Sequence, residues 1–140
     1  MTQIDLQRRY LQCVTFMITK LKMYVQGFRD YYQHYQALPT GKAADAERQA
    51  LAVNFQRSLM NFKKLIHRFQ ALEVPVQYQQ QHKLLVSLYQ TYVTSLTTLA
   101  AALTDQKETA SVEALQQRCQ QSLVQIRTGL TTAYQLKQAF

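Results

Sequence analysis

The chain is poor in the residues that end helices and shape loops. Its 140 residues include three Gly, two Pro and no Trp. Because β-sandwiches and barrels need many turns, and turns depend on Gly and Pro, this scarcity excludes a loop-rich β fold and predicts long elements with short connections. The two cysteines, Cys13 and Cys119, are too few for a disulfide framework and stand at no metal-binding spacing.

Long apolar runs are also missing. The most apolar stretch, residues 10–18, contains Gln12 and Thr15 and is less than half as long as the ~20 residues that a transmembrane helix needs. Residues 1–9 carry charges but no apolar segment of the kind found in signal peptides. We therefore expect one domain over residues 1–140, no integral membrane segment and a cytoplasmic location.

Acidic residues are scarce as well. Eight Asp and Glu stand against sixteen Lys and Arg, which gives a net charge of +8. Residues 1–72 hold eleven basic and four acidic residues, a net charge of +7, whereas residues 73–140 hold five and four, a net charge of +1. Such a basic half is typical of proteins that bind nucleic acid or an anionic membrane surface.

What the sequence does contain is a heptad pattern. From residue 10 to residue 38, apolar and aromatic side chains recur in alternating steps of four and three, the spacing at which helices pack in a gentle supercoil. These inward-facing positions, which we call the seam, are Tyr10, Val14, Met17, Leu21, Tyr24, Phe28, Tyr31, Tyr35 and Leu38. The rhythm returns in three later segments. We therefore predict an all-α, antiparallel four-helix bundle with helices at about residues 3–38, 43–72, 76–104 and 111–139.

The breaks between these segments are short. Pro39 ends the first segment, Pro75 follows the second, and Ser111 is the expected N-cap of the fourth. Short loops join neighbouring antiparallel helices, which predicts an up-down-up-down order within one chain. The alternative is two helical hairpins, residues 1–72 and 73–140, that complete their core only as a dimer.

No constellation of catalytic or metal-binding residues can be assembled from the sequence. Di-iron bundles need inward-facing carboxylates, but no seam position is Asp or Glu. The histidines His34, His67 and His82 fall in three different predicted helices. Neither cysteine has a His and a carboxylate placed to activate it, and no Gly-rich phosphate loop occurs. The sequence therefore predicts a non-enzymatic protein that needs no cofactor or metal.

His82 stands on the apolar seam of the third predicted helix. Folding the chain about its loops places it near Tyr10 and Tyr134, which predicts a buried polar core residue whose ring is satisfied by a tyrosine hydroxyl. Seven of the nine tyrosines lie on the seams of the first and third helices. These tyrosines either fill the core or line a small-molecule pocket.

Basic side chains on the outer sides of the first two predicted helices form a candidate electrostatic binding face. Charges at these positions also serve simply to solvate a bundle, since few exposed aromatic residues stand between them to stack on bases. The residues of this predicted face are Arg8, Lys22, Arg29, Arg57, Lys63, Lys64 and Arg68.

Phe16 and Met23 lie seven residues apart on the first helix, outside its completed seam. A helix that is apolar on more than one side is usually covered on more than one side. These two residues therefore predict self-association, as a dimer or a larger homo-oligomer, or contact with a partner protein.

Residues 71–137 resemble a helical hairpin found in uncharacterised proteins of Gram-positive bacteria. The shared pattern is a Pro, a His seven residues later, a Leu/Tyr-rich helix, an Asp-containing break and a second amphipathic helix. In this chain it consists of Pro75, His82, Tyr89, Leu96, Leu99, Leu103, Asp105 and Leu115. The resemblance implies a bacterial helical hairpin and carries no activity with it.

In class and charge, the chain is also similar to the bacteriocin immunity proteins of lactic acid bacteria. Those are small, basic, cytoplasmic four-helix bundles, and no motif is shared. The leading functional hypothesis is a non-enzymatic protein-interaction module. The alternatives are a basic bundle that binds nucleic acid or an anionic membrane through its first two helices, and an immunity-like protein.

Overall fold

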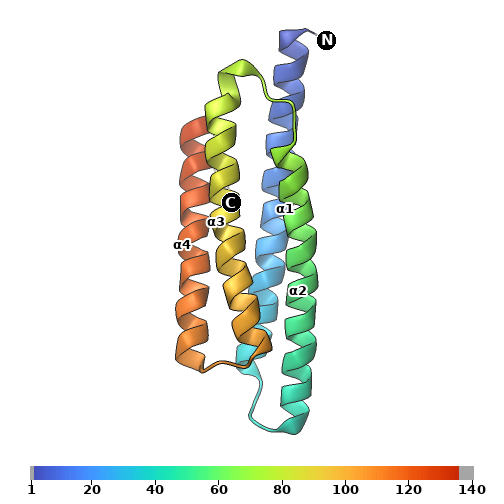
Figure 1. Ribbon diagram of the computed structural model, residues 1–140, viewed down its shortest axis with the longest axis vertical. Coiled ribbons are helices and arrows are strands. Elements are labelled where there is room, and N and C mark those ends of the chain that lie inside the picture. The colour runs from blue at the N-terminus through green and yellow to red at the C-terminus, as the bar shows by residue number, and fades with distance from the viewer. Residues whose placement is uncertain (1, 136–140) are drawn as a thin grey trace.

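The computed structural model describes residues 2–135 and consists of four α-helices. Their bounds are Gln3–Ala37 for α1, Lys42–Gln70 for α2, Gln79–Thr104 for α3 and Thr109–Tyr134 for α4, and the 3₁₀ turn η1, Val76–Tyr78, precedes α3. No β-strand occurs among these described residues. The predicted all-α four-helix bundle is confirmed (Figure 1).

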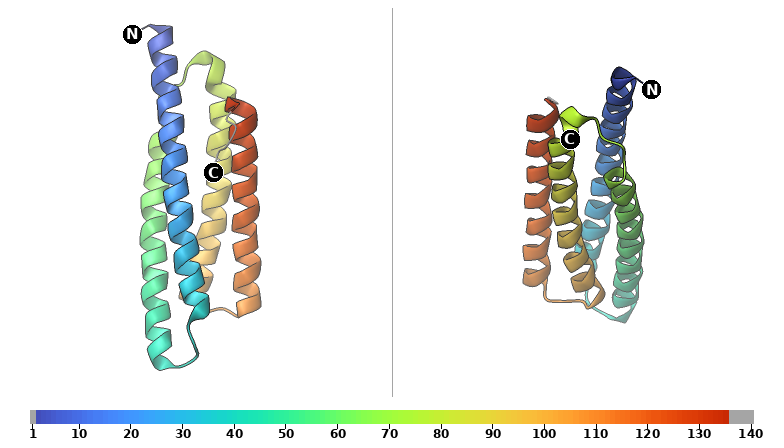
Figure 2. Two further views of the ribbon diagram at one scale, coloured as in Figure 1. Left: turned by 180° about the vertical axis from the view of Figure 1, so that it is seen from behind. Right: turned by 45° about the horizontal axis from the view of Figure 1, so that its top comes forward.

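The helices alternate in direction, and each packs against the next one in the chain. α1 lies against α2, α2 against α3 and α3 against α4, with short loops between them (Figures 1 and 2). One hydrophobic core runs through all four helices and includes the fully buried Leu21, Phe62, Tyr89 and Ile126. Contact between α2 and α3 thus joins the two halves of the chain within one copy. Hairpins that need a dimer to complete their core are not the arrangement seen.

Two predicted helix starts were wrong by two or three residues. α4 begins at Thr109, because the Val112 amide already donates to the Glu108 carbonyl at 3.1 Å, so Ser111 lies inside the helix and does not cap it. The segment predicted from residue 76 opens with η1, whose Tyr78 amide bonds to the Pro75 carbonyl at 2.9 Å, and becomes α-helical only at Gln79. The predicted end of the last helix, residues 136–139, lies outside the described residues.

α3 ends in a tight turn, and the connection to α4 is short. Gln106 has a φ of 50°, and the amide of Lys107 reaches back to the Ala102 carbonyl at 3.0 Å. This pair of features is a Schellman-type C-cap, built here without glycine. The turn satisfies the carbonyls of Ala102 and Leu103 and changes the direction of the chain, and α4 begins after only four residues.

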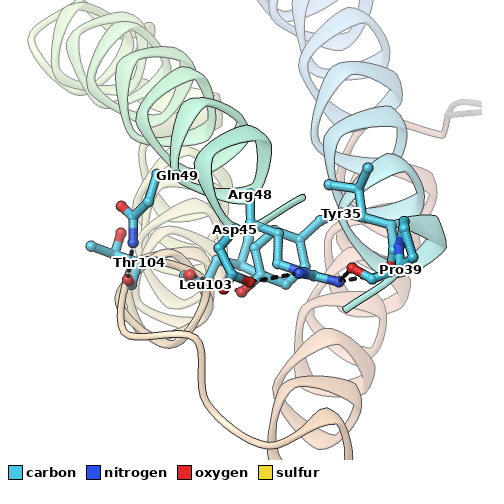
Figure 3. A network of polar contacts seen from close by, with 8 residues as sticks. Tyr35, Pro39, Asp45, Arg48, Gln49, Leu103 and Thr104 are labelled. Atoms are coloured by element: carbon cyan, nitrogen blue, oxygen red, sulfur yellow. Dashed lines mark hydrogen bonds and ion pairs between the residues drawn. The ribbon is translucent and has the colours of Figure 1, made fainter. Parts of the chain in front are cut away.

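A polar network closes the end of the bundle where α1 passes into α2 (Figure 3). The Arg48 guanidinium donates to the Asp45 carboxylate at 2.9 Å and to the carbonyls of Leu38 and Pro39, both at 2.6 Å. Tyr35 donates to the Leu103 carbonyl at 3.0 Å and so ties α1 to the end of α3. Arg48 is therefore a structural cation and is not available to a binding partner.

Spacing between helices differs around the bundle. α4 lies close to α3, where a Cβ on Gly129 would stand only 2.7 Å from Leu88 Cδ1 and the hydroxyls of Ser95 and Ser122 are 3.4 Å apart. In contrast, no Cα atom of α1 comes within 8 Å of one in α4. Large side chains bridge this wider gap, since the Tyr10 hydroxyl of α1 lies 2.6 Å from the Tyr134 hydroxyl of α4.

Candidate functional site: the basic face of α1 and α2

Two features of the structure could carry a function: a polar cluster in the aromatic core and a basic surface on α1 and α2. In the cluster, the Tyr10 hydroxyl lies 2.9 Å from Nδ1 of His82 and 2.6 Å from the Tyr134 hydroxyl. Aromatic rings enclose His82, with the centroid of Phe69 at 4.6 Å and that of Tyr10 at 5.5 Å. The structure thus shows His82 buried beside a tyrosine hydroxyl and among aromatic rings.

Burial sets the protonation of this cluster. Burial raises the pKa of Tyr10 and of Tyr134. It lowers the pKa of His82, and the main chain of Gln70, which raises that pKa, offsets part of the lowering. All three groups are therefore neutral at pH 7. Nε2 of His82 and the hydroxyl of Tyr89 have no hydrogen-bond partner within residues 2–135. The cluster is best explained as a buried network that fixes the packing of the four helices.

The seven cations of the predicted electrostatic face lie in three places. Arg8, Lys22 and Arg29 share the side of α1 away from α2, where Arg8 lines a shallow hollow. Lys63 lines a cleft between α2 and α3 together with Gln90 and Val93.

The remaining three lie together near α1. Arg68 lines a groove between α1 and α2. Arg57 and Lys64 precede it by eleven and four residues, spacings that return to the same side of a helix. Only Arg57, Lys64 and Arg68 therefore share a surface with each other and with the exposed apolar residues of α1.

The groove between α1 and α2 consists of two adjoining hollows of about 170 and 190 Å³ that share Cys13 and Leu72. Apart from Arg68, the first hollow is lined by apolar side chains: Cys13, Phe16, Met17, Leu65, Phe69 and Leu72. Arg9 and Glu73 flank the second, which Leu6 and Tyr10 also line. The groove is thus mainly apolar inside, with Arg68 at one hollow and the oppositely charged Arg9 and Glu73 at the other.

Arg9 and Lys20 also lie on this surface, although neither is among the seven predicted cations. The ammonium of Lys20 lies 5.4 Å above the Phe16 ring. Arg9 precedes Phe16 by seven residues and Met23 follows it by seven, so all four lie on one side of α1. The same heptad rule that located the seam could have found them, had the α2-facing side of α1 been known.

Phe16 and Met23, the two residues from which self-association was predicted, are 52% and 54% exposed, so the described chain does not cover them. We call the surface that they form with the neighbouring cations the α1–α2 face. Its residues are Arg9, Phe16, Lys20, Met23, Arg57, Lys64 and Arg68.

Carboxylates are scarce along the α1–α2 face, and Glu73 lies at the end of its groove beside Arg9. Residues 6–29 and 48–72 contain no Asp or Glu. These two stretches run side by side, since Tyr10 meets Phe69 near one end and Phe28 meets Phe55 near the other, at ring-centroid distances of 6.5 and 4.9 Å. The ion pairs His34–Glu47 and Asp45–Arg48 lie at the loop end and involve none of the five cations of the face.

Other kinds of site find little support in residues 2–135. They contain no group of three or more His, Cys, Asp or Glu side chains placed to hold a metal ion. Within the same range, no helix is long and apolar enough to cross a membrane. No protein-family model matches the chain, and the curated proteins and the solved structures give no match either.

Proposed function

We propose that this protein is a non-enzymatic interaction module and that the α1–α2 face is its contact surface. One observation carries the proposal: half-exposed Phe16 and Met23 share a face with five cations, and the carboxylate that lines its groove, Glu73, lies at one end beside Arg9. Large exposed apolar side chains next to a field of one charge sign are typical of surfaces that a partner covers. The partner that fits such a face is negatively charged.

The titratable groups support the non-enzymatic part. The described groups with shifted pKa values are six tyrosines, Cys119 and His82, and burial is the largest cause in each. Catalytic sites instead combine a shifted acid or base with a reacting partner in an open cleft. Here the shifted groups belong mainly to the core.

The experiment compares two variants of equal net charge. The face variant replaces the five cations of the α1–α2 face by Gln: Arg9, Lys20, Arg57, Lys64 and Arg68. The control variant replaces five basic residues outside it by Gln: Arg8, Lys22, Arg29, Lys63 and Lys83. Both lower the formal net charge from +8 to +3, so any difference between them reports position and not total charge.

Binding of each variant is titrated against duplex DNA, RNA, anionic vesicles and a membrane-free cell extract at two salt concentrations. We expect the affinity of the face variant for its partner to fall at least about tenfold, because removing cations from the contact surface weakens binding to a polyanion. The control variant should keep most of its affinity. Equal weakening in both variants would show that only overall charge matters and would reject the α1–α2 face as the contact surface.

Nucleic acid is the second candidate partner, because the carboxylate-free stretch of α1, residues 6–29, lies antiparallel to that of α2 over about 36 Å at 1.5 Å per residue. Phe16 is the exposed aromatic residue of the face, however, and binders of single strands stack successive bases on several aromatic rings. The titration with DNA and RNA decides this candidate.

A further inference from the structure

The distribution of apolar side chains on the α1–α2 face points to one class of anionic partner. Phe16 and Met23 lie on the same side of α1 as Arg9 and Lys20, and Phe16 lines the groove together with Arg68 of α2. Interfacial helices of membrane-bound proteins show this pattern, in which apolar groups enter the acyl boundary and Lys and Arg stay at the phosphates. A nucleic acid bound through its hydrated phosphate backbone would leave Phe16 and Met23 in water.

The outer side of α2 continues the pattern. Val53 and Met60 are exposed, and each stands four residues before a cation, Arg57 and Lys64 respectively. Apolar and basic side chains therefore alternate along α2 as they do along α1. Because the two helices lie side by side, the alternation covers a broad surface instead of a single stripe (Figure 2).

The lining of the groove between the helices is complementary to a phospholipid. Its walls near Cys13 are apolar, as an acyl chain requires, and Arg68 offers a guanidinium to phosphate oxygens there, whereas Arg9 shares its hollow with Glu73. A polynucleotide has no group that would fill apolar hollows of this kind. A second copy of this chain is a poor occupant too, since it would set the same five cations against their own copies.

We propose that the α1–α2 face lies flat on an anionic phospholipid bilayer, with Phe16 and Met23 in the acyl boundary and Arg9, Lys20, Arg57, Lys64 and Arg68 at the lipid phosphates. This inference rests on the proposed function, which makes the α1–α2 face the contact surface. It adds the class of partner and the orientation of the bundle on it.

The test uses the fact that the chain has no Trp. Phe16→Trp places a single indole on the face, which is excited selectively over the nine tyrosines, and Met23→Trp is a second reporter in case the first variant does not fold. Val124→Trp is the matched control, because Val124 lies on α4, away from the face, and is 54% exposed, almost the same as Phe16. Vesicles of phosphatidylcholine alone and vesicles with 30% phosphatidylglycerol by composition are compared, each with and without brominated acyl chains.

We expect the emission of the Phe16→Trp variant to shift to the blue and to be quenched by brominated chains, only with anionic vesicles. The Val124→Trp variant should show neither change. Each basic residue near a charged bilayer contributes about fivefold in affinity, so the five-residue face variant should bind anionic vesicles at least about a hundredfold more weakly. The control charge variant should bind within about tenfold of the unaltered chain.

The outcomes separate the two proposals. Equal responses of the Phe16→Trp and Val124→Trp variants, or equal binding to both kinds of vesicle, would overturn the membrane orientation. If vesicles do not bind but the face variant alone loses binding to nucleic acid or to a partner in the membrane-free extract, the proposed function stands and the membrane inference fails. If the face and control variants never differ, both fail.

Discussion

The hydroxyl of Tyr10 connects residues from three helices, and its ring meets a fourth. It bonds to His82 of α3 and Tyr134 of α4, while the ring lies 6.5 Å from that of Phe69 on α2. A single polar contact at this position therefore depends on the register of the whole bundle. Buried polar networks of this kind contribute more to a unique arrangement than to total stability.

His82 gives this cluster a measurable pH dependence. Burial lowers its pKa below the ordinary 6.5, so the unfolded chain takes up a proton at higher pH than the folded one. The stabilisation that comes from neutral, buried His82 is complete above about pH 6.5. It is lost as the pH falls from there through the folded-state pKa. We expect the free energy of unfolding, measured with urea, to decrease from pH 7.5 to pH 5.

A matched pair of variants assigns this loss to His82. His82→Gln removes the titrating group and should flatten the dependence between pH 7.5 and pH 5, whereas His67→Gln, on the exposed side of α2, should leave it unchanged. A dependence that survives in the His82→Gln variant would show that another group causes it.

At the scale of elements, the small residues of α4 explain why the bundle is asymmetric. Gly129 and Ser122 let α4 approach α3 closely, whereas Tyr10 and Tyr134 fill the wider space between α1 and α4. The core is filled between α3 and α4 by close approach of the helices and between α1 and α4 by large side chains.

The two helical glycines test this explanation. A Cβ on Gly27 would meet nothing within 4 Å, so Gly27→Ala should stabilise α1 by about 0.5–1 kcal/mol through helix propensity alone. At Gly129 the same gain is offset because Leu88 must move, and we expect Gly129→Ala to change stability by less than about 0.5 kcal/mol. Gly129→Leu should force α4 away from α3 and destabilise by about 1–3 kcal/mol.

Urea midpoints of the three variants decide the matter. A Gly27→Ala variant that is less stable than the unaltered chain would mean that α1 has a close neighbour at this position, which would contradict the arrangement of α1 and α2 described above. A Gly129→Leu variant of full stability would contradict the close packing of α3 on α4.

At the scale of the whole molecule, the sequence predicted the core better than the surface. Each seam repeats along one helix, so the inward direction of α1 follows from its own residues. Which neighbour lies on which flank depends on the handedness of the bundle, and no single helix encodes that. Arg8 and Arg9 are adjacent in sequence, yet Arg8 lies on the side away from α2 and Arg9 lines the groove toward it. This is why the predicted electrostatic face grouped residues that the fold separates.

The same limit applies to self-association. Phe16 and Met23 predict a dimer when α1 is considered alone, but the fold surrounds them with cations from α2 that face no carboxylate in residues 6–29 or 48–72. An isologous contact through the α1–α2 face would bring each of these charges near its own copy. Apolar contact therefore favours a dimer here and charge opposes it, and ionic strength decides which effect is larger.

We therefore expect a monomer mass of 16.3 kDa in light scattering at low salt and a dimer fraction that grows with added salt. Repulsion weakens as the Debye length falls from ~30 Å at 0.01 M to ~3 Å at 1 M salt, while burial of Phe16 and Met23 does not weaken. Replacing both residues by Ser should abolish the salt-induced dimer, and Val124→Ser should not affect it. A dimer that is present at low salt and dissociates as salt is added would mean that its interface pairs opposite charges. Such an interface would have to lie mainly elsewhere on the bundle, because the α1–α2 face sets five cations against the one carboxylate that lines its groove, Glu73.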